Sequence, residues 1–76
     1  MSEATWLRIF GDNLLDMLGD RGMTQKDLAE ESGLSEGTIS KYLCKKQMPG
    51  VKALINISHA LDCTLDELMD FGDTIV

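Results

Sequence analysis

Apolar residues recur at three- and four-residue steps along most of this chain, which is the spacing of amphipathic helices. The first such stretch predicts a helix from Thr5 to about Asp20, in which Thr5 is the N-cap. The apolar positions of this helix are Trp6, Phe10, Leu14, Met17 and Leu18. The stripe they form predicts that one face of the helix packs against a core.

Polar caps and glycines divide the rest of the chain into further helices. The pair Thr24 and Asp27 is similar to a capping box and predicts a short helix from Gln25 to about Glu31, after which Gly33 suits a left-handed turn. The other predicted helices run from the cap Ser35 to about Leu43 or Cys44, from Val51 to about Leu61, and from the capping box Thr64–Glu67 through Met69. No segment has the pattern of a strand, so the predicted fold class is all-α with five helices.

The spacing of small and apolar residues between residues 25 and 42 carries more information. Counted from Gln25, a small residue stands fifth (Ala29), a glycine ninth (Gly33) and a β-branched residue fifteenth (Ile39). A small side chain lets two steeply crossing helices approach, and glycine tolerates the positive φ of a tight turn. Ile39 and Tyr42 then hold the second helix against the core. The pattern is typical of a helix-turn-helix, whose second helix enters the DNA major groove.

A chain of 76 residues has room for a single domain, which we place at residues 1–76 with the helix-turn-helix at about 25–44 and a short tail at 72–76. Seven Lys and Arg against thirteen Asp and Glu give a net charge of −6 at pH 7, which is unusual for a DNA-binding protein. The bases are not evenly spread, because residues 37–61 contain no carboxylate and four lysines: Lys41, Lys45, Lys46 and Lys52. The sequence therefore predicts one basic face on an acidic body.

Several other classes of protein are disfavoured. The apolar runs are too short for a membrane span, and the N-terminus has no signal-peptide pattern, so we expect a cytoplasmic protein. Cys44 and Cys63 are too few for a disulfide scaffold, and His59 with Cys63 supplies only two ligands for zinc. With no nucleophile–base pair or phosphate-binding loop, we expect neither an enzyme nor a cofactor or metal.

The chain resembles the Cro- and lambda-repressor-like helix-turn-helix domains, also called the XRE family. The matching segments are residues 24–29, 33–35, 38–43, 49, 60–61 and 65–68. They are dispersed, stand in the family's order and span about residues 7 to 69. The resemblance implies a compact five-helix lambda-repressor-like domain in which the second and third helices form the helix-turn-helix.

The resemblance also implies a role for individual residues. Base edges are contacted from the exposed start of the third predicted helix, which maps to Glu36, Gly37, Thr38 and Lys41. Helix geometry agrees, because residues 36, 37, 40, 41 and 44 must face outward if Ile39 and Tyr42 face inward. The positions implied to contact the DNA backbone carry Gln25 and Ser35. Lys45, Lys46 and Lys52 flank that surface and suit phosphate contacts.

The function expected from the resemblance is a sequence-specific transcriptional regulator, in particular a repressor from a phage or mobile element that binds double-stranded DNA at a palindromic operator. The candidate surface for a homodimer is apolar and consists of Leu65, Met69, Phe71, Ile75 and Val76. An alternative is a protein-interaction module of the antitoxin or anti-repressor type with little specific DNA recognition. This alternative is favoured if the acidic side chains of Glu30, Glu31 and Glu36 lie on the basic surface, whereas a surface free of acids favours DNA.

Overall fold

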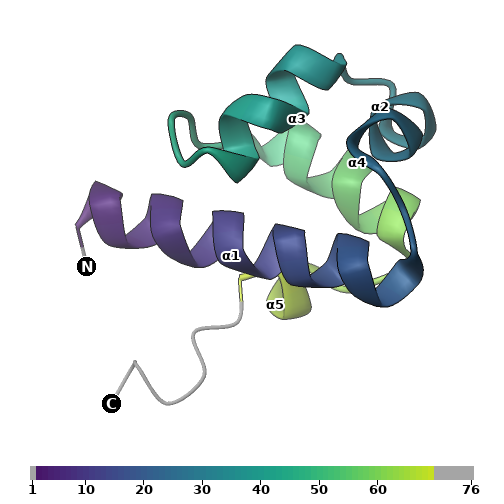
Figure 1. Cartoon of the computed structure of the whole chain (residues 1–76). Helices are drawn as coiled ribbons and strands as arrows, with labels where there is room; N and C mark the ends of the chain where they lie inside the picture. The colour runs from purple at the N-terminus through teal and green to yellow at the C-terminus, as the bar shows by residue number, and fades with distance from the viewer. Residues whose placement is uncertain (1, 70–76) are drawn as a thin grey trace.

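The computed structural model describes residues 2–69, which form five helices and no strand (Figure 1). The helices are α1 (Glu3–Arg21), α2 (Gln25–Ser32), α3 (Glu36–Leu43), α4 (Val51–Leu61) and α5 (Leu65–Leu68). In Figure 1, α1 runs beneath α2, α3 and α4, and the short α5 lies below α1. The predicted all-α class with five helices is confirmed. None of these described helices is long and apolar enough to cross a membrane.

The first helix begins earlier than predicted, so the assignment of Thr5 as its N-cap was wrong. Ser2 is the N-cap: its Oγ accepts a hydrogen bond from the Thr5 amide at 3.2 Å. The two hydroxyl groups also lie 2.9 Å apart. Both residues are good caps and stand three positions apart, and the chain uses the first of them because this satisfies the amides of an additional turn.

The other helix ends follow the predictions closely. Capping boxes are present at Thr24–Asp27 and at Thr64–Glu67, and α4 has the predicted bounds. α2 continues one residue further than predicted, to Ser32. The Ser32 side chain is buried and bridges the end of the helix, since its hydroxyl donates to the Ala29 carbonyl and accepts from the Leu34 amide. α5 ends at Leu68, and Met69 is its C-cap.

One apolar core joins all five helices. Its members are Phe10, Leu14, Leu18, Leu28, Ala29, Ile39, Tyr42, Ile57, Leu61 and Leu68. The rings of Phe10 and Tyr42 connect α1 to α3 in an edge-to-face contact with centroids 5.7 Å apart. The inward positions predicted for α2 and α3 are confirmed at Leu28 and Ile39, whereas Trp6 of the predicted α1 stripe is only half-buried.

α1 also holds the carboxyl ends of two other helices. The Arg21 Nε donates to the Leu61 carbonyl at the end of α4, and the Asn13 side-chain amide donates to the Leu68 carbonyl at the end of α5. Such carbonyls have no partner within their own helix. α1 therefore acts as a frame helix, with α2, α3 and α4 on one side of it and α5 on the other (Figure 1).

Candidate nucleic-acid interface

The turn between α2 and α3 has the geometry of a helix-turn-helix. Gly33 ends α2 with φ +74° and ψ 13°, in the left-handed region. Ala29 is 6% exposed where the two helices pack together, and Ser35 caps the start of α3. The small residue, the glycine and the cap thus occupy the places that the sequence pattern predicts, and together they set the angle at which α3 leaves the body.

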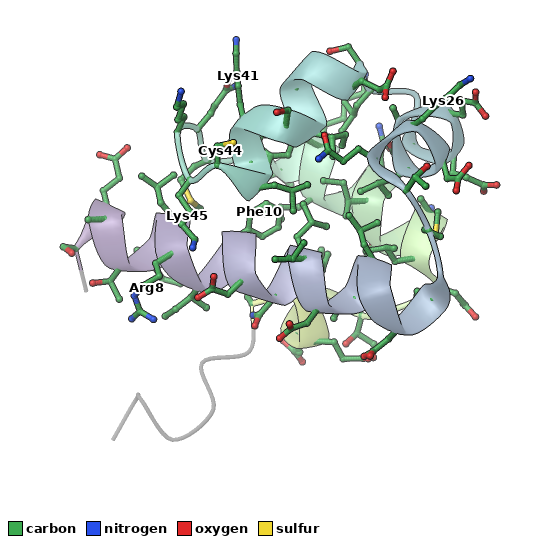
Figure 2. All side chains as sticks on the ribbon, in the orientation of Figure 1. Arg8, Phe10, Lys26, Lys41, Cys44 and Lys45 are labelled. Carbon is green, nitrogen blue, oxygen red and sulfur yellow. The ribbon has the colours of Figure 1, made fainter. Side chains whose placement is uncertain are left out.

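α3 buries one face and presents the other to solvent. Ile39 and Tyr42 are 0% and 3% exposed and hold the inner face. On the outer face, residues 36, 37, 41 and 44 are exposed and residue 40 is half-buried, as predicted from helix geometry. Figure 2 shows the Lys41 side chain extending away from the body. Lys41 is the basic side chain on this face, and Gly37, Ser40 and Cys44 beside it are small.

The hydroxyl groups at the start of α3 are engaged with one another. The Ser35 Oγ accepts from the Thr38 amide at 3.1 Å, and the hydroxyls of Ser35 and Thr38 lie 2.8 Å apart. Ser35 is exposed and Thr38 is half-buried. The predicted backbone-contacting residue and the predicted base-contacting residue therefore form one unit, in which a ligand of Ser35 would also affect Thr38.

The first turn of α2 adds a basic residue that the sequence analysis did not select. Gln25 and Lys26 are both exposed, and Lys26 extends away from the body (Figure 2). Hydrogen bonds from the Thr24 backbone amide and hydroxyl hold the pKa of the neighbouring Asp27 carboxyl below its ordinary value of 3.8. Asp27 therefore stays ionised and its charge partly offsets that of Lys26. Lys26 could have been selected from the sequence because it stands next to Gln25 in the capped first turn of this helix.

The three other predicted phosphate-binding lysines differ in how they are held. Lys46 and Lys52 are exposed, in the loop after α3 and in the first turn of α4. Lys45 instead points down toward α1 (Figure 2), and its Nζ lies 2.8 Å from Asp12 Oδ1. All four lysines, Lys41 included, are exposed, and Lys45 differs in that its ammonium group is paired with Asp12 of the frame helix.

Acidic residues are also exposed on the helices of the helix-turn-helix. Glu30 and Glu31 are exposed on α2, and Glu36 is exposed in the first turn of α3 itself. Over residues 2–69, no cluster of three or more His, Cys, Asp or Glu is placed to hold a metal ion. The interface is thus a mixed one, with lysines at the end of α3 and a carboxylate at its start.

A family model described as helix-turn-helix matches residues 15–68, which include all of α2, α3 and α4. The chain belongs to this helix-turn-helix family. The match covers more than half of the sequence and confirms the resemblance that the motif residues indicate. It also places the Gly33 turn and the outer face of α3 in the segment from which the family takes its name.

One relative within the curated proteins is the uncharacterized HTH-type transcriptional regulator YqaE of Bacillus subtilis (strain 168). It is 33% identical over 61 residues, which is 80% of this chain and 53% of the relative. The chain therefore spans about half the length of that protein. The shared part is large enough to include the whole helix-turn-helix, and it leaves the relative with sequence that has no counterpart here.

Two solved structures are similar to this helix-turn-helix chain. The restriction-modification controller protein C.AhdI from Aeromonas hydrophila matches with a TM-score of 0.79 and 26% identity, over 82% of this chain and 94% of the controller. The hypothetical transcription factor NHTF from Neisseria matches with a TM-score of 0.81 over 91% of this chain and 79% of NHTF. The identity to NHTF is 19%, so that likeness concerns the fold.

Proposed function

We propose that this chain is a DNA-binding transcriptional regulator that recognises a specific sequence by placing α3 in the major groove. The observation that carries the proposal is the outer face of α3, which is exposed at residues 36, 37, 41 and 44 and bears Lys41 directed away from the body. A helix presented in this way fits the major groove and can reach base edges. The relatives support the proposal, since one is named a transcriptional regulator and another a restriction-modification controller protein.

The proposed base contacts come from Glu36, Gly37, Thr38 and Lys41. A lysine donates to guanine O6 and N7, a threonine methyl packs on the thymine methyl, and a glutamate accepts from the cytosine amino group. Gly37 contributes by its size, because the absence of a side chain lets the backbone of α3 approach the bases. Glu36 is then selective, since away from a cytosine its charge is repelled by the phosphates.

The proposed phosphate contacts come from two helices and from the two loops that flank α3. They are Gln25 in α2, Ser35 in the turn, Lys46 in the loop and Lys52 in α4. Lys45 belongs to this group by position, but its ammonium group is held by Asp12. Contacts of this kind set orientation and register and add affinity that does not depend on sequence.

We further propose that the protein acts in the cytoplasm as a repressor, of phage or mobile-element origin, by occupying a palindromic operator as a homodimer without catalysis or a cofactor. Two apolar side chains support a dimer surface on α1 and α5, which contact each other: Leu15 is 60% exposed and Leu65 42% exposed. Met69 beside them is half-buried. The other residues assigned to this surface, Phe71, Ile75 and Val76, lie outside the described residues.

The dimer is tested by the solution mass of the chain, measured by light scattering over a range of concentrations. We expect the wild-type chain to have twice the mass of a monomer and Leu65→Glu to reduce that mass, because it places a charge in an apolar contact. Val51→Glu is the matched control, since Val51 is 73% exposed but lies on α4. A monomeric wild-type chain, or an equal loss in both variants, would contradict this dimer surface.

The regulator is tested by selection from a pool of random DNA duplexes at two salt concentrations. We expect an enriched motif and an affinity that falls by about 0.9 log units per log unit of salt for each phosphate contact. Lys41→Ala should relax the preference at one base position, with a loss of about 1–3 kcal/mol in discrimination. Lys52→Ala is the contrasting variant: it should weaken all sequences alike and lower the salt slope.

A second candidate function is a protein-interaction module of the antitoxin or anti-repressor type. The observation in its favour is Glu36 at the start of the outward face of α3, on a chain with a net charge of −6. If no motif is enriched and binding is weak even at low salt, this candidate replaces the regulator. Glu36→Gln separates the two: in a regulator it changes the preferred base, because glutamine pairs with adenine rather than cytosine.

A further inference from the structure

The side chain of Lys45 packs against two consecutive residues of α1. Gly11 is buried, and a methyl group in place of its hydrogen would come within 3.0 Å of Lys45 Cγ and 3.4 Å of Lys45 Cε. Asp12 follows Gly11 and receives the ammonium group at 2.8 Å. The glycine therefore leaves room for the aliphatic stem, and the aspartate neutralises the charge at the end of it.

The backbone of Lys45 also supports this arrangement. Lys45 has φ +63°, a left-handed conformation in which a residue with a side chain is uncommon. Its amide donates to the Tyr42 carbonyl at 3.1 Å, and the following amide, that of Lys46, donates to the Lys41 carbonyl at 2.9 Å. The loop is thus closed on the end of α3, and the Lys45 side chain leaves it toward α1.

Lys45 is itself exposed and differs from the neighbouring lysines in its pairing with Asp12. Lys46 is exposed, and Lys41, one turn earlier on α3, extends away from the body (Figure 2). Among residues 2–69, the pair of Lys45 with Asp12 is the one ion pair between side chains. One lysine of the basic group is therefore paired with a carboxylate of the frame helix, although its side chain remains 42% exposed.

We propose that Asp12 lowers the affinity of this protein for DNA by holding Lys45 on α1 and so withdrawing one positive charge from the phosphate contacts. The inference rests on the proposed function, since it concerns DNA binding by the same surface. A protein with fewer phosphate contacts binds all sequences less tightly, and a larger share of its affinity then comes from base contacts. Asp12 is accordingly a positioning residue that lowers the affinity for all sequences alike.

The test is a double-mutant cycle on the salt dependence of binding to one duplex. Asp12→Asn removes the partner of Lys45, and we expect it to steepen the salt slope by about 0.9 log units per log unit of salt, the value for one phosphate contact. Lys45→Gln alone should leave the slope unchanged, because the charge it removes is not in contact with DNA. Lys45→Gln added to Asp12→Asn should restore the wild-type slope.

Asp16→Asn is the matched control, since Asp16 is an exposed aspartate one turn along α1. It reports the effect of removing any acid from this helix, so an equal change in slope for both variants would overturn the inference. A lower slope for Lys45→Gln alone would also overturn it, because Lys45 would then contact phosphate in the wild-type protein. A wild-type chain that shows no salt-dependent binding to DNA would instead refute the proposed function, which is a separate result.

Discussion

The two turns on either side of α3 use the same left-handed backbone conformation with different residues. The turn before α3 has Gly33 at φ +74°, and the turn after it has Lys45 at φ +63°. An added Cβ at Gly33 meets no atom within 4 Å, so this turn depends on its own backbone. The second turn depends on α1, which receives the Lys45 side chain through Gly11 and Asp12.

The end of α4 shows the same contrast. Asp62 has φ +51° without being glycine, and there too α1 supplies a contact, from Arg21 Nε to the Leu61 carbonyl at 2.6 Å. Gly22 ends α1 in the left-handed conformation with open space around it, as Gly33 does for α2. At both such positions among the described residues, Lys45 and Asp62, α1 contacts the residue itself or the one before it.

The largest effect on this contrast is expected from Gly11→Ala, which removes the space for Lys45. The new methyl group would lie 3.0 Å from the Tyr42 carbonyl oxygen, part of the backbone of α3, as well as against the Lys45 stem. Crowding of this kind costs about 1–3 kcal/mol of unfolding free energy, more than the ~1 kcal/mol that alanine gains over glycine in a helix. The melting temperature should therefore fall, by about 4–8 °C for each kcal/mol lost.

Gly19→Ala is the matched control for that measurement. Gly19 is exposed on the same helix, and an added Cβ there meets no atom within 4 Å. Only the gain in helix propensity remains, so this variant should melt higher than the wild type, by up to about 1 kcal/mol in unfolding free energy. Equal melting temperatures for the two variants would show that the contact between α1 and the second turn is loose.

The same contrast explains how much of the molecule the sequence predicts. The Gly33 turn and the caps at Thr24 and Thr64 are local, so that a few consecutive residues determine them, and the predictions there are confirmed. The direction of Lys45 depends on Asp12, which is remote in sequence, and no local pattern carries that information. Thr5 was misassigned for another reason: Ser2 is an equally good cap, and local propensity does not choose between them.

The candidate interface also has features that a local sequence pattern predicts and others that it does not. The inner and outer faces of α3 follow from periodicity, so the exposure of residues such as Gly37 and Lys41 could be predicted. The contact between the Ser35 and Thr38 hydroxyls and the ion pair of Lys45 with Asp12 depend on the positions of individual atoms. Helix periodicity does not predict such contacts. The base and phosphate contacts assigned to this surface are predictions still, and the selection experiment is their test.

A loss of similar size is expected from Gly33→Ala, which tests whether the first turn depends on backbone conformation alone. Because an added Cβ has open space there, the cost is that of the left-handed conformation itself, about 1–2 kcal/mol of unfolding free energy in a denaturant titration. Gly33→Asn should lose less, since asparagine tolerates this conformation better than alanine. If both variants are as stable as the wild type, the turn can change its conformation and the contrast with the second turn disappears.

The smallest effect on the unfolding free energy is expected from Lys45→Gly, which places a glycine at the left-handed position of the second turn. It relieves the left-handed strain at φ +63° but gives up the stem contact with α1 and the half-exposed pair with Asp12. An exposed ion pair contributes about 0–1 kcal/mol, comparable to the ~1–2 kcal/mol that the backbone gains, so the unfolding free energy should stay within about 1 kcal/mol of the wild type. A loss much larger than this would mean that the contact of Lys45 with α1, rather than its backbone, holds the second turn. That result would make the contact of Lys45 with α1 a structural requirement of the fold, whereas a near-neutral result would show that the fold does not require it.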